Sequence, residues 1–186
     1  MNNKTIAVIL TSLLVSPIAM SQDAPSYSYG EIAYKSFDFD SFDTSGVNLK
    51  GSLSISDNLF IIADYSNTSG SDDGFDFDLT TQGYGLGANF DLSNGGSWYV
   101  SYSLNTWDFD GFDVDVNTSR VGYRQNISKQ LELNISITSN DIEGDVSESG
   151  NQIGLVYSAS DSMKVTAEYE TLDDIDMVSL GLRFNF

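Results

Sequence analysis

The sequence predicts a transmembrane antiparallel up-and-down β-barrel of ten strands, with eight as the alternative, preceded by a cleavable signal peptide. Three observations support this all-β fold class. Apolar and polar residues alternate along most of the chain, short turns alternate with longer acidic connections, and basic residues lie in phase with the polar positions. A period of two indicates strands, because successive side chains point to opposite faces. The length of 186 residues suits one domain.

The N-terminal residues have the layout of a secretory signal peptide. Lys4 precedes a short apolar run at residues 6–15, and small residues up to Ser21 offer a cleavage site. The run is shorter than the roughly 20 apolar residues that a helix needs to cross a bilayer. We therefore expect a signal peptide at residues 1–21 and a barrel domain at residues 22–186.

The ten candidate strands follow one another through the barrel domain. The last is the clearest, because Val178, Leu180, Leu182, Phe184 and Phe186 alternate with polar or small residues. The alternation is weakest near residues 121–123, 153–157 and 163–169. In chain order the candidates are residues 27–37, 47–55, 59–65, 84–90, 98–104, 121–123, 131–137, 153–157, 163–169 and 178–186.

The connections between these strands alternate in length. Short turns are expected at residues 56–58, 91–96, 126–130 and 159–162, and longer acidic loops at residues 38–44, 67–78, 108–115, 140–149 and 171–175. Short turns at one end and longer loops at the other are typical of bacterial outer-membrane barrels, which have an even number of strands. An even number places both termini on the periplasmic side.

The basic residues distinguish a membrane barrel from a soluble barrel or sandwich, which would show the same alternation. Of the eight Lys and Arg residues, Lys4 lies in the expected signal peptide, which leaves seven. Only Lys129 falls in a turn. A charge on a lipid-facing side would cost several kcal/mol, and the apolar face carries none. The other six are in phase with the polar face: Lys35, Lys50, Arg120, Arg124, Lys164 and Arg183.

Aromatic residues on the apolar face form two levels, as expected for the girdles at the two membrane interfaces. Toward the long-loop end lie Tyr34, Tyr65, Tyr84, Tyr102 and Tyr169. Toward the short-turn end lie Phe90, Trp98, Tyr123, Tyr157, Phe184 and Phe186. We therefore expect localisation in the bacterial outer membrane, in contact with its lipid and lipopolysaccharide.

Several short motifs resemble the small bacterial outer-membrane β-barrel proteins, porin-like proteins that include diffusible-signal-regulated and vesicle-associated members. The motifs are YSYGEIAY at residues 27–34, VNLKGS at 47–52 and GYGLGA at 83–88. The resemblance implies a fold and a location more than an activity. It also implies that Phe184 and Phe186, in the terminal LRFNF, form the signal that the barrel-assembly machinery reads.

Composition excludes several functions. A net charge of -19 repels nucleic acid, and the absence of Cys removes disulfides and thiolate metal sites. The chain has no His, so it departs from the ten-stranded omptin proteases, which it resembles in strand number, and from Ser-His hydrolases. Paired carboxylates would still suit a glycosidase, but no pocket is indicated. We expect no enzymatic activity and no cofactor.

The acidic loops are the one candidate metal site. Asp108, Asp110, Asp113 and Asp115 surround Gly111, and carboxylate oxygens suit Ca²⁺ or Mg²⁺. The spacing is not that of an EF-hand. The interpretation we favour is that the recurrent Phe-Asp motif marks strand ends beyond the membrane, with Asp solvated on one side.

The polar face predicts a charge network inside the barrel. A turn centred near Ser128 would place Arg124 directly opposite Glu132, and the turn at Asp57 would place Lys50 opposite Asp64. The inward acidic and basic residues are nearly equal in number, which favours a lumen plugged by paired charges over an ion-selective pore. The network comprises Glu31, Lys50, Asp64, Arg120, Arg124, Glu132, Lys164, Glu168 and Arg183, with Lys35 and Glu170 on the same face.

These observations predict a monomeric barrel with a structural or surface-interaction role. The alternative is a narrow porin-like channel for small solutes, since ten strands enclose a lumen far smaller than that of the 16–18-stranded porins. A wet lumen would leave the charges solvated and of little energetic consequence.

Overall fold

The computed structural model describes residues 24–39, 42–72, 75–142, 146–173 and 175–186. The predicted signal peptide at residues 1–21 lies outside these residues. No helix in the described part of the chain is long and apolar enough to cross a membrane.

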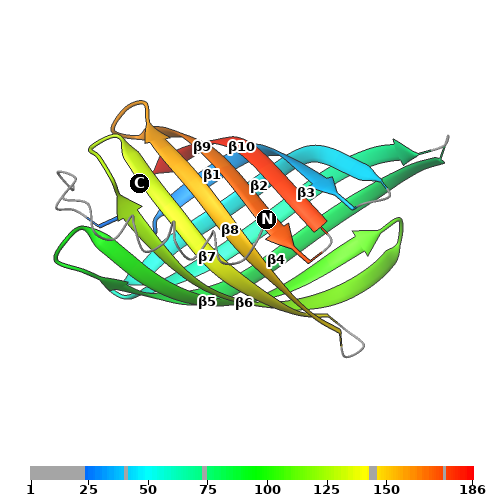
Figure 1. Cartoon of the computed structure of the whole chain (residues 1–186), viewed down its shortest axis with the longest axis horizontal. Coiled ribbons are helices and arrows are strands. Elements are labelled where there is room, and N and C mark those ends of the chain that lie inside the picture. The colour runs from blue at the N-terminus through cyan, green and yellow to red at the C-terminus, as the bar shows by residue number, and fades with distance from the viewer. Residues whose placement is uncertain (1–23, 40–41, 73–74, 143–145, 174) are drawn as a thin grey trace.

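Ten antiparallel strands form one closed barrel, in which every strand pairs with its neighbours in sequence and β1 pairs with β10 (Figure 1). The predicted ten-stranded up-and-down barrel is therefore confirmed. The strands are β1 (Tyr29–Asp38), β2 (Asp43–Ser56), β3 (Leu59–Asp72), β4 (Phe75–Asp91), β5 (Gly96–Phe109), β6 (Phe112–Asn126), β7 (Leu131–Ile142), β8 (Val146–Ser158), β9 (Met163–Leu172) and β10 (Ile175–Asn185).

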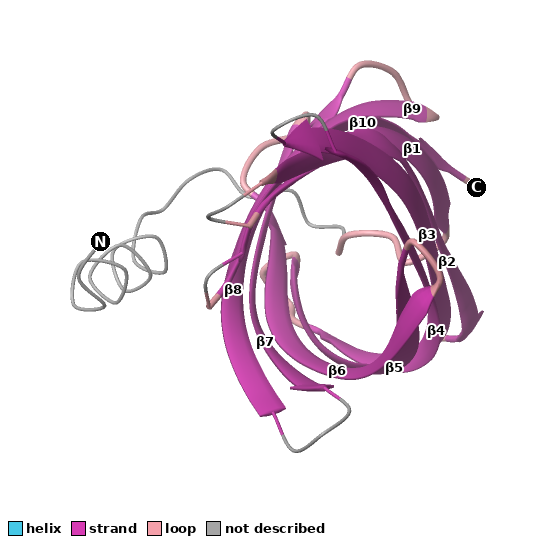
Figure 2. Ribbon diagram, turned by 90° about the vertical axis from the view of Figure 1, so that its right-hand side faces the viewer, coloured by secondary structure: helices cyan, strands magenta, loops and turns pink. Residues whose placement is uncertain are grey.

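The barrel closes where the first strand meets the last. Tyr29 lies opposite Asn185 and Asp38 opposite Asp176, so β1 and β10 are paired along their whole length. The amide of Phe186 also donates to the carbonyl of Ser28 at 3.3 Å. Closure removes the free edges that an open sheet would present, and the strands curve into a complete ring (Figure 2). Both ends of the described chain therefore meet at one rim.

The connections differ from the expected long loops. At the rim opposite the termini, only two to four residues separate consecutive strands, and the acidic segments are mostly strand. The β5–β6 turn consists of Asp110 and Gly111 alone, with φ of 51° and 89°. Positive φ at both positions is the geometry of a type I′ hairpin turn, which Asp-Gly favours. The acidic segments are thus hairpins that extend the barrel.

The two faces of the barrel follow the alternation in the sequence. Outward apolar side chains such as Leu180 and Ile137 are each 61% exposed, whereas inward polar side chains such as Asn48 are buried. Tyr123 lies on the outer face as predicted, directly opposite Trp98, but little of its side chain is exposed. It is only 6% exposed, because the Trp98 ring lies against it with centroids 5.0 Å apart.

Candidate functional site: the barrel lumen

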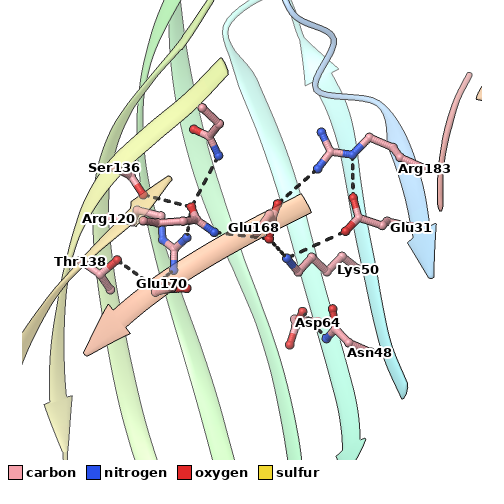
Figure 3. Close-up of polar contacts among 12 residues, drawn as sticks. Glu31, Asn48, Lys50, Asp64, Arg120, Ser136, Thr138, Glu168, Glu170 and Arg183 are labelled. Atoms are coloured by element: carbon pink, nitrogen blue, oxygen red, sulfur yellow. Dashed lines mark hydrogen bonds and ion pairs between the residues drawn. The ribbon is translucent and has the colours of Figure 1, made fainter. Parts of the chain in front are cut away.

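Ion pairs in the middle of the lumen join the strands on both sides of the β1–β10 closure (Figure 3). Arg183 Nε on β10 donates to Glu31 Oε2 on β1 at 2.7 Å. Lys50 on β2 pairs with Glu168 on β9, and its Nζ is 4.0 Å from Glu31 Oε1. Arg183 also lies 3.6 Å from Glu168. These four side chains form one connected group.

A second group lies on the wall formed by β6 to β9. Arg120 donates to Glu170 at 2.6 Å and to Gln152 Oε1 at 2.7 Å. The hydroxyl of Thr138 donates to the same Glu170 oxygen at 3.1 Å (Figure 3). The hydroxyl of Ser136 donates to Gln152 at 3.1 Å. The carboxylate and the amide therefore each accept several hydrogen bonds, as a buried polar network requires.

The third pair, Arg124 with Glu132, forms in a register that differs from the expected one. Arg124 lies opposite Asn134, and Glu132 lies opposite Asn126. The direct opposition predicted from a turn centred at Ser128 is therefore wrong. The long Arg124 side chain still reaches Glu132 along the diagonal of the ladder, and its Nε lies 2.7 Å from Glu132 Oε1. Both residues are buried.

Three charged residues of the predicted network stand apart from these pairs. Lys50 lies opposite Asp64 in the register, but Asp64 accepts from the Asn48 amide at 3.0 Å while the Lys50 amine pairs with Glu168. Within the described residues, Lys35 and Lys164 have no carboxylate oxygen within 4.0 Å. The Lys35 amine instead lies 4.4 Å from the centroid of an aromatic ring, that of Phe37.

An aromatic cluster lies inside the lumen at the rim where the termini meet. Tyr27, which precedes β1, stacks on Phe60 with ring centroids 4.6 Å apart and meets Tyr99 edge-on at 6.2 Å. Its hydroxyl lies 3.1 Å from that of Ser97, and Arg124 lies 4.5 Å above its ring. Burial raises the pKa of the Tyr27 phenol to about 12.

A second apolar cluster lies inside the lumen at the hairpin rim. Phe37, Leu79, Leu172 and Met177 are buried there and pack together inside the barrel. Four further side chains extend the cluster toward the hairpin tips: Phe39, Trp107, Phe109 and Ile175. Three Phe residues of the Phe-Asp motif, Phe37, Phe39 and Phe109, thus belong to this inner apolar cluster.

A cavity of about 240 Å³ lies between the two clusters. Its lining includes Phe60 and Tyr99 from one cluster and Leu172 and Met177 from the other. Eight charged side chains of the polar face line its walls: Lys35, Lys50, Asp64, Arg120, Arg124, Glu168, Glu170 and Arg183. The lumen is therefore a polar chamber with an apolar layer at each end.

The four candidate metal ligands do not form a coordination site. No group of three or more His, Cys, Asp or Glu side chains that could hold a metal occurs among the described residues. Asp108 instead accepts a hydrogen bond from the amide of Gly111 at 2.6 Å, and Asp115 accepts one from Thr106 at 3.2 Å. Asp110 accepts one from the amide of Asp78. Asp108 and Asp115 thus support the β5–β6 hairpin, and Asp110 links its tip to β4.

The two residues of the expected assembly signal point outward. Phe184 is 46% exposed and Phe186 is 76% exposed, both beside the β1–β10 closure. Sequence reasoning did not find the inward apolar residues Phe60, Tyr99 and Met177. A signal was present, because these large apolar side chains occupy positions in the polar phase of their strands.

Comparison with known proteins agrees with this geometry. The NanC porin has a TM-score of 0.50 at 10% identity, covering 84% of this chain and 98% of that one. The KdgM porin has a TM-score of 0.45 at 11% identity, covering 84% of this chain and 99% of that one. Neisserial surface protein A has a TM-score of 0.42 at 15% identity, covering 85% of this chain and 95% of that one. No curated protein sequence matches significantly. The family model of the outer membrane protein beta-barrel domain matches residues 5–176, and the chain belongs to that family.

Proposed function

We propose that this outer-membrane barrel is closed to solutes and has a structural or surface-interaction role, without enzymatic activity. The observation that carries the proposal is the pair of apolar layers at the two ends of the lumen. One is centred on Tyr27, Phe60 and Tyr99, and the other on Phe37 and Met177. An ion would have to leave its hydration shell to pass either layer, and hydrophobic constrictions of this kind block conduction.

The charge network supports the same proposal. Arg124, Glu132, Glu31 and Arg183 are buried, and removing one partner of a buried ion pair costs about 3–5 kcal/mol. A solute that passed through the lumen would have to displace some of these pairs. The network therefore holds the walls together and adds a barrier between the two apolar layers.

A narrow porin-like channel is the second candidate. The polar chamber of about 240 Å³ favours it, because the chamber already provides a space lined by charged side chains such as Lys35 and Asp64. Conduction would require both apolar layers to move aside. The layer at the rim of the termini includes Tyr27, which lies outside the strands.

Single-channel recording in planar lipid bilayers separates the two functions. The sample is mature protein purified from outer membranes. Its measured mass should correspond to a chain that begins at Gln22. Wild-type protein should give no conductance steps. A triple variant, Tyr27→Ala with Phe60→Ala and Met177→Ala, removes side chains from both layers and should give steps.

A matched control replaces outward neighbours on the same strands, Ile61→Ala and Val178→Ala, and should remain silent. Folding of every sample is checked by its electrophoretic mobility without heating. Regular ohmic steps from the wild-type barrel would contradict the closed form and establish the channel.

A further inference from the structure

Two side chains of opposite charge face the chamber without an ion-pair partner in the described part of the chain. The Lys35 amine has no carboxylate oxygen within 4.0 Å and lies 4.4 Å from the centroid of the Phe37 ring. The Asp64 carboxylate has no cationic nitrogen within 4.0 Å, and one of its oxygens accepts from the Asn48 amide at 3.0 Å. The other six charged side chains that line the chamber each belong to an ion pair.

The register of the strands keeps these two residues apart. Lys35 on β1 lies opposite Gly46 on β2, whereas Asp64 on β3 lies opposite Lys50, four residues further along β2. Four residues of strand and two strand spacings separate the two Cα atoms by about 16 Å along the wall. The Lys50 amine pairs with Glu168 on the far side of the closure, so it does not neutralise Asp64.

The chamber has room for a ligand that reaches both charges. Its volume of about 240 Å³ is far larger than the roughly 10–15 Å³ that one water molecule requires. Small residues on β4 and β5, such as Gly83 and Ser101, line the same space. Neither Lys35 nor Asp64 is fully buried.

The charge of the ligand follows from the two free side chains. An ionised group inside a protein costs free energy unless it is paired or hydrogen-bonded. A simple anion would pair with Lys35 and leave Asp64 unpaired, and a simple cation would do the reverse. A molecule with one charge of each sign would neutralise both.

We infer that the chamber binds a small zwitterion, such as an amino acid, whose carboxylate pairs with Lys35 and whose ammonium pairs with Asp64. Charge-assisted hydrogen bonds at both ends fix the orientation of the ligand. The inference rests on the proposed function, because a lumen closed at both ends, as proposed, would retain the ligand in the chamber.

Ligand-dependent melting of the mature barrel tests this inference. The barrel is refolded in detergent micelles with millimolar glycine, γ-aminobutyrate or ε-aminocaproate, so that the ligand need not cross the apolar layers. These three zwitterions differ in the distance between their charges. At least one should raise the temperature at which the folded electrophoretic form is lost by about 3 °C or more, since it binds only the folded state. Butyrate and butylamine each carry one of the two charges and should raise it by less than about 1 °C.

Substitutions at the two ends of the site locate the ligand. Lys35→Met and Asp64→Asn should each abolish the shift that the zwitterion causes. Without ligand, Lys35→Met should melt no lower than wild type, because it removes an unpaired charge. The matched control is Lys164→Met. Among the described residues Lys164 also has no carboxylate oxygen within 4.0 Å, but it does not line the chamber, so this variant should keep the shift.

No stabilisation of wild type by any of the three zwitterions, equal stabilisation by butyrate, or an unchanged shift in Lys35→Met would each overturn the inference. The comparison of γ-aminobutyrate with butyrate uses wild-type protein and stands even where a variant fails to fold. The conductance recordings are a separate test. Steps from wild type would contradict the closed lumen and leave the shift in melting unchanged, whereas a silent barrel that no zwitterion stabilises would overturn the binding site alone.

Discussion

The charged residues of the lumen differ in whether each one has a partner of opposite sign. Glu132 is 2% exposed and Arg124 is 5% exposed, so neither has water to replace its partner. Lys35 and Asp64 face the chamber and have weaker contacts, an aromatic ring for one and an amide for the other. Loss of a partner should therefore be most costly at the Arg124–Glu132 pair.

Reversing one charge of this pair should destabilise the barrel. Glu132→Lys places a second cation beside buried Arg124, and we expect the free energy of unfolding to fall by about 3–5 kcal/mol. The double variant Glu132→Lys with Arg124→Glu restores opposite charges and should recover much of the loss. Urea titration in detergent micelles, followed by tryptophan fluorescence, measures both.

The control for charge alone is Lys129→Glu, at an exposed turn beside the same hairpin, which should have little effect. If Glu132→Lys and the double variant both unfold like wild type, the pair is solvated and the lumen is wet.

The sequence predicted which side chains face inward but not all of their partners. Alternation with period two placed every residue of the network on one face. It could not place the centre of the four-residue β6–β7 turn. An error of one residue in that centre shifts the residue expected opposite each position by two, so Arg124 lies opposite Asn134 in place of Glu132. Contacts across the lumen, such as Lys50 on β2 with Glu168 on β9, depend on the closed shape and leave no trace in local alternation.

The acidic hairpins show why strands were mistaken for loops. Beyond the membrane the outer face no longer needs apolar residues, so Asp replaces them there while Phe stays on the inner face. Phe39 and Phe109, for example, meet edge-on with centroids 6.3 Å apart at the top of the barrel. The alternation therefore continues in the hairpins, but the inner face is now apolar and the outer face polar. A prediction based on outward apolar residues therefore ends each strand too early.

Calcium should leave the β5–β6 hairpin unchanged. Asp108 and Asp115 already accept hydrogen bonds from the hairpin itself, and the carboxylates do not converge on one point. We expect millimolar Ca²⁺ to shift the melting temperature of the barrel by less than 1 °C, since a ligand stabilises only a state that it binds. Differential scanning fluorimetry with Ca²⁺ against matched ionic strength from NaCl measures this, and a clear shift that Asp108→Asn abolishes would contradict it.

The closure between β1 and β10 is the feature of the whole molecule that depends most on distant residues. It joins the two ends of the described chain, and a long loop must be closed before its contacts form. Ion pairs from Arg183 to Glu31 and from Lys50 to Glu168 cross this closure from inside. The predicted strand number implied that such a closure exists. Tyr27, which precedes the first strand, could not be placed inside the lumen from the sequence.

Arg183→Gln should therefore weaken the closure in particular. Among the described residues it leaves buried Glu31 with one cationic partner, Lys50 at 4.0 Å, so the temperature at which the folded electrophoretic form is lost should fall by several degrees. Arg120→Gln breaks a pair that does not cross the closure and is the matched control.

Ile32 and Leu182 lie opposite each other on the outer face of β1 and β10. Directly opposed positions on adjacent strands are close enough for a disulfide.

The chain has no cysteine, so a bond between Ile32→Cys and Leu182→Cys would be the only disulfide. Oxidation of this pair should restore the melting temperature of Arg183→Gln and should restore that of Arg120→Gln much less, because only the former acts by separating β1 from β10. Equal recovery of both variants would show that the disulfide stabilises the barrel generally, and that the Arg183–Glu31 pair has no special part in keeping it closed.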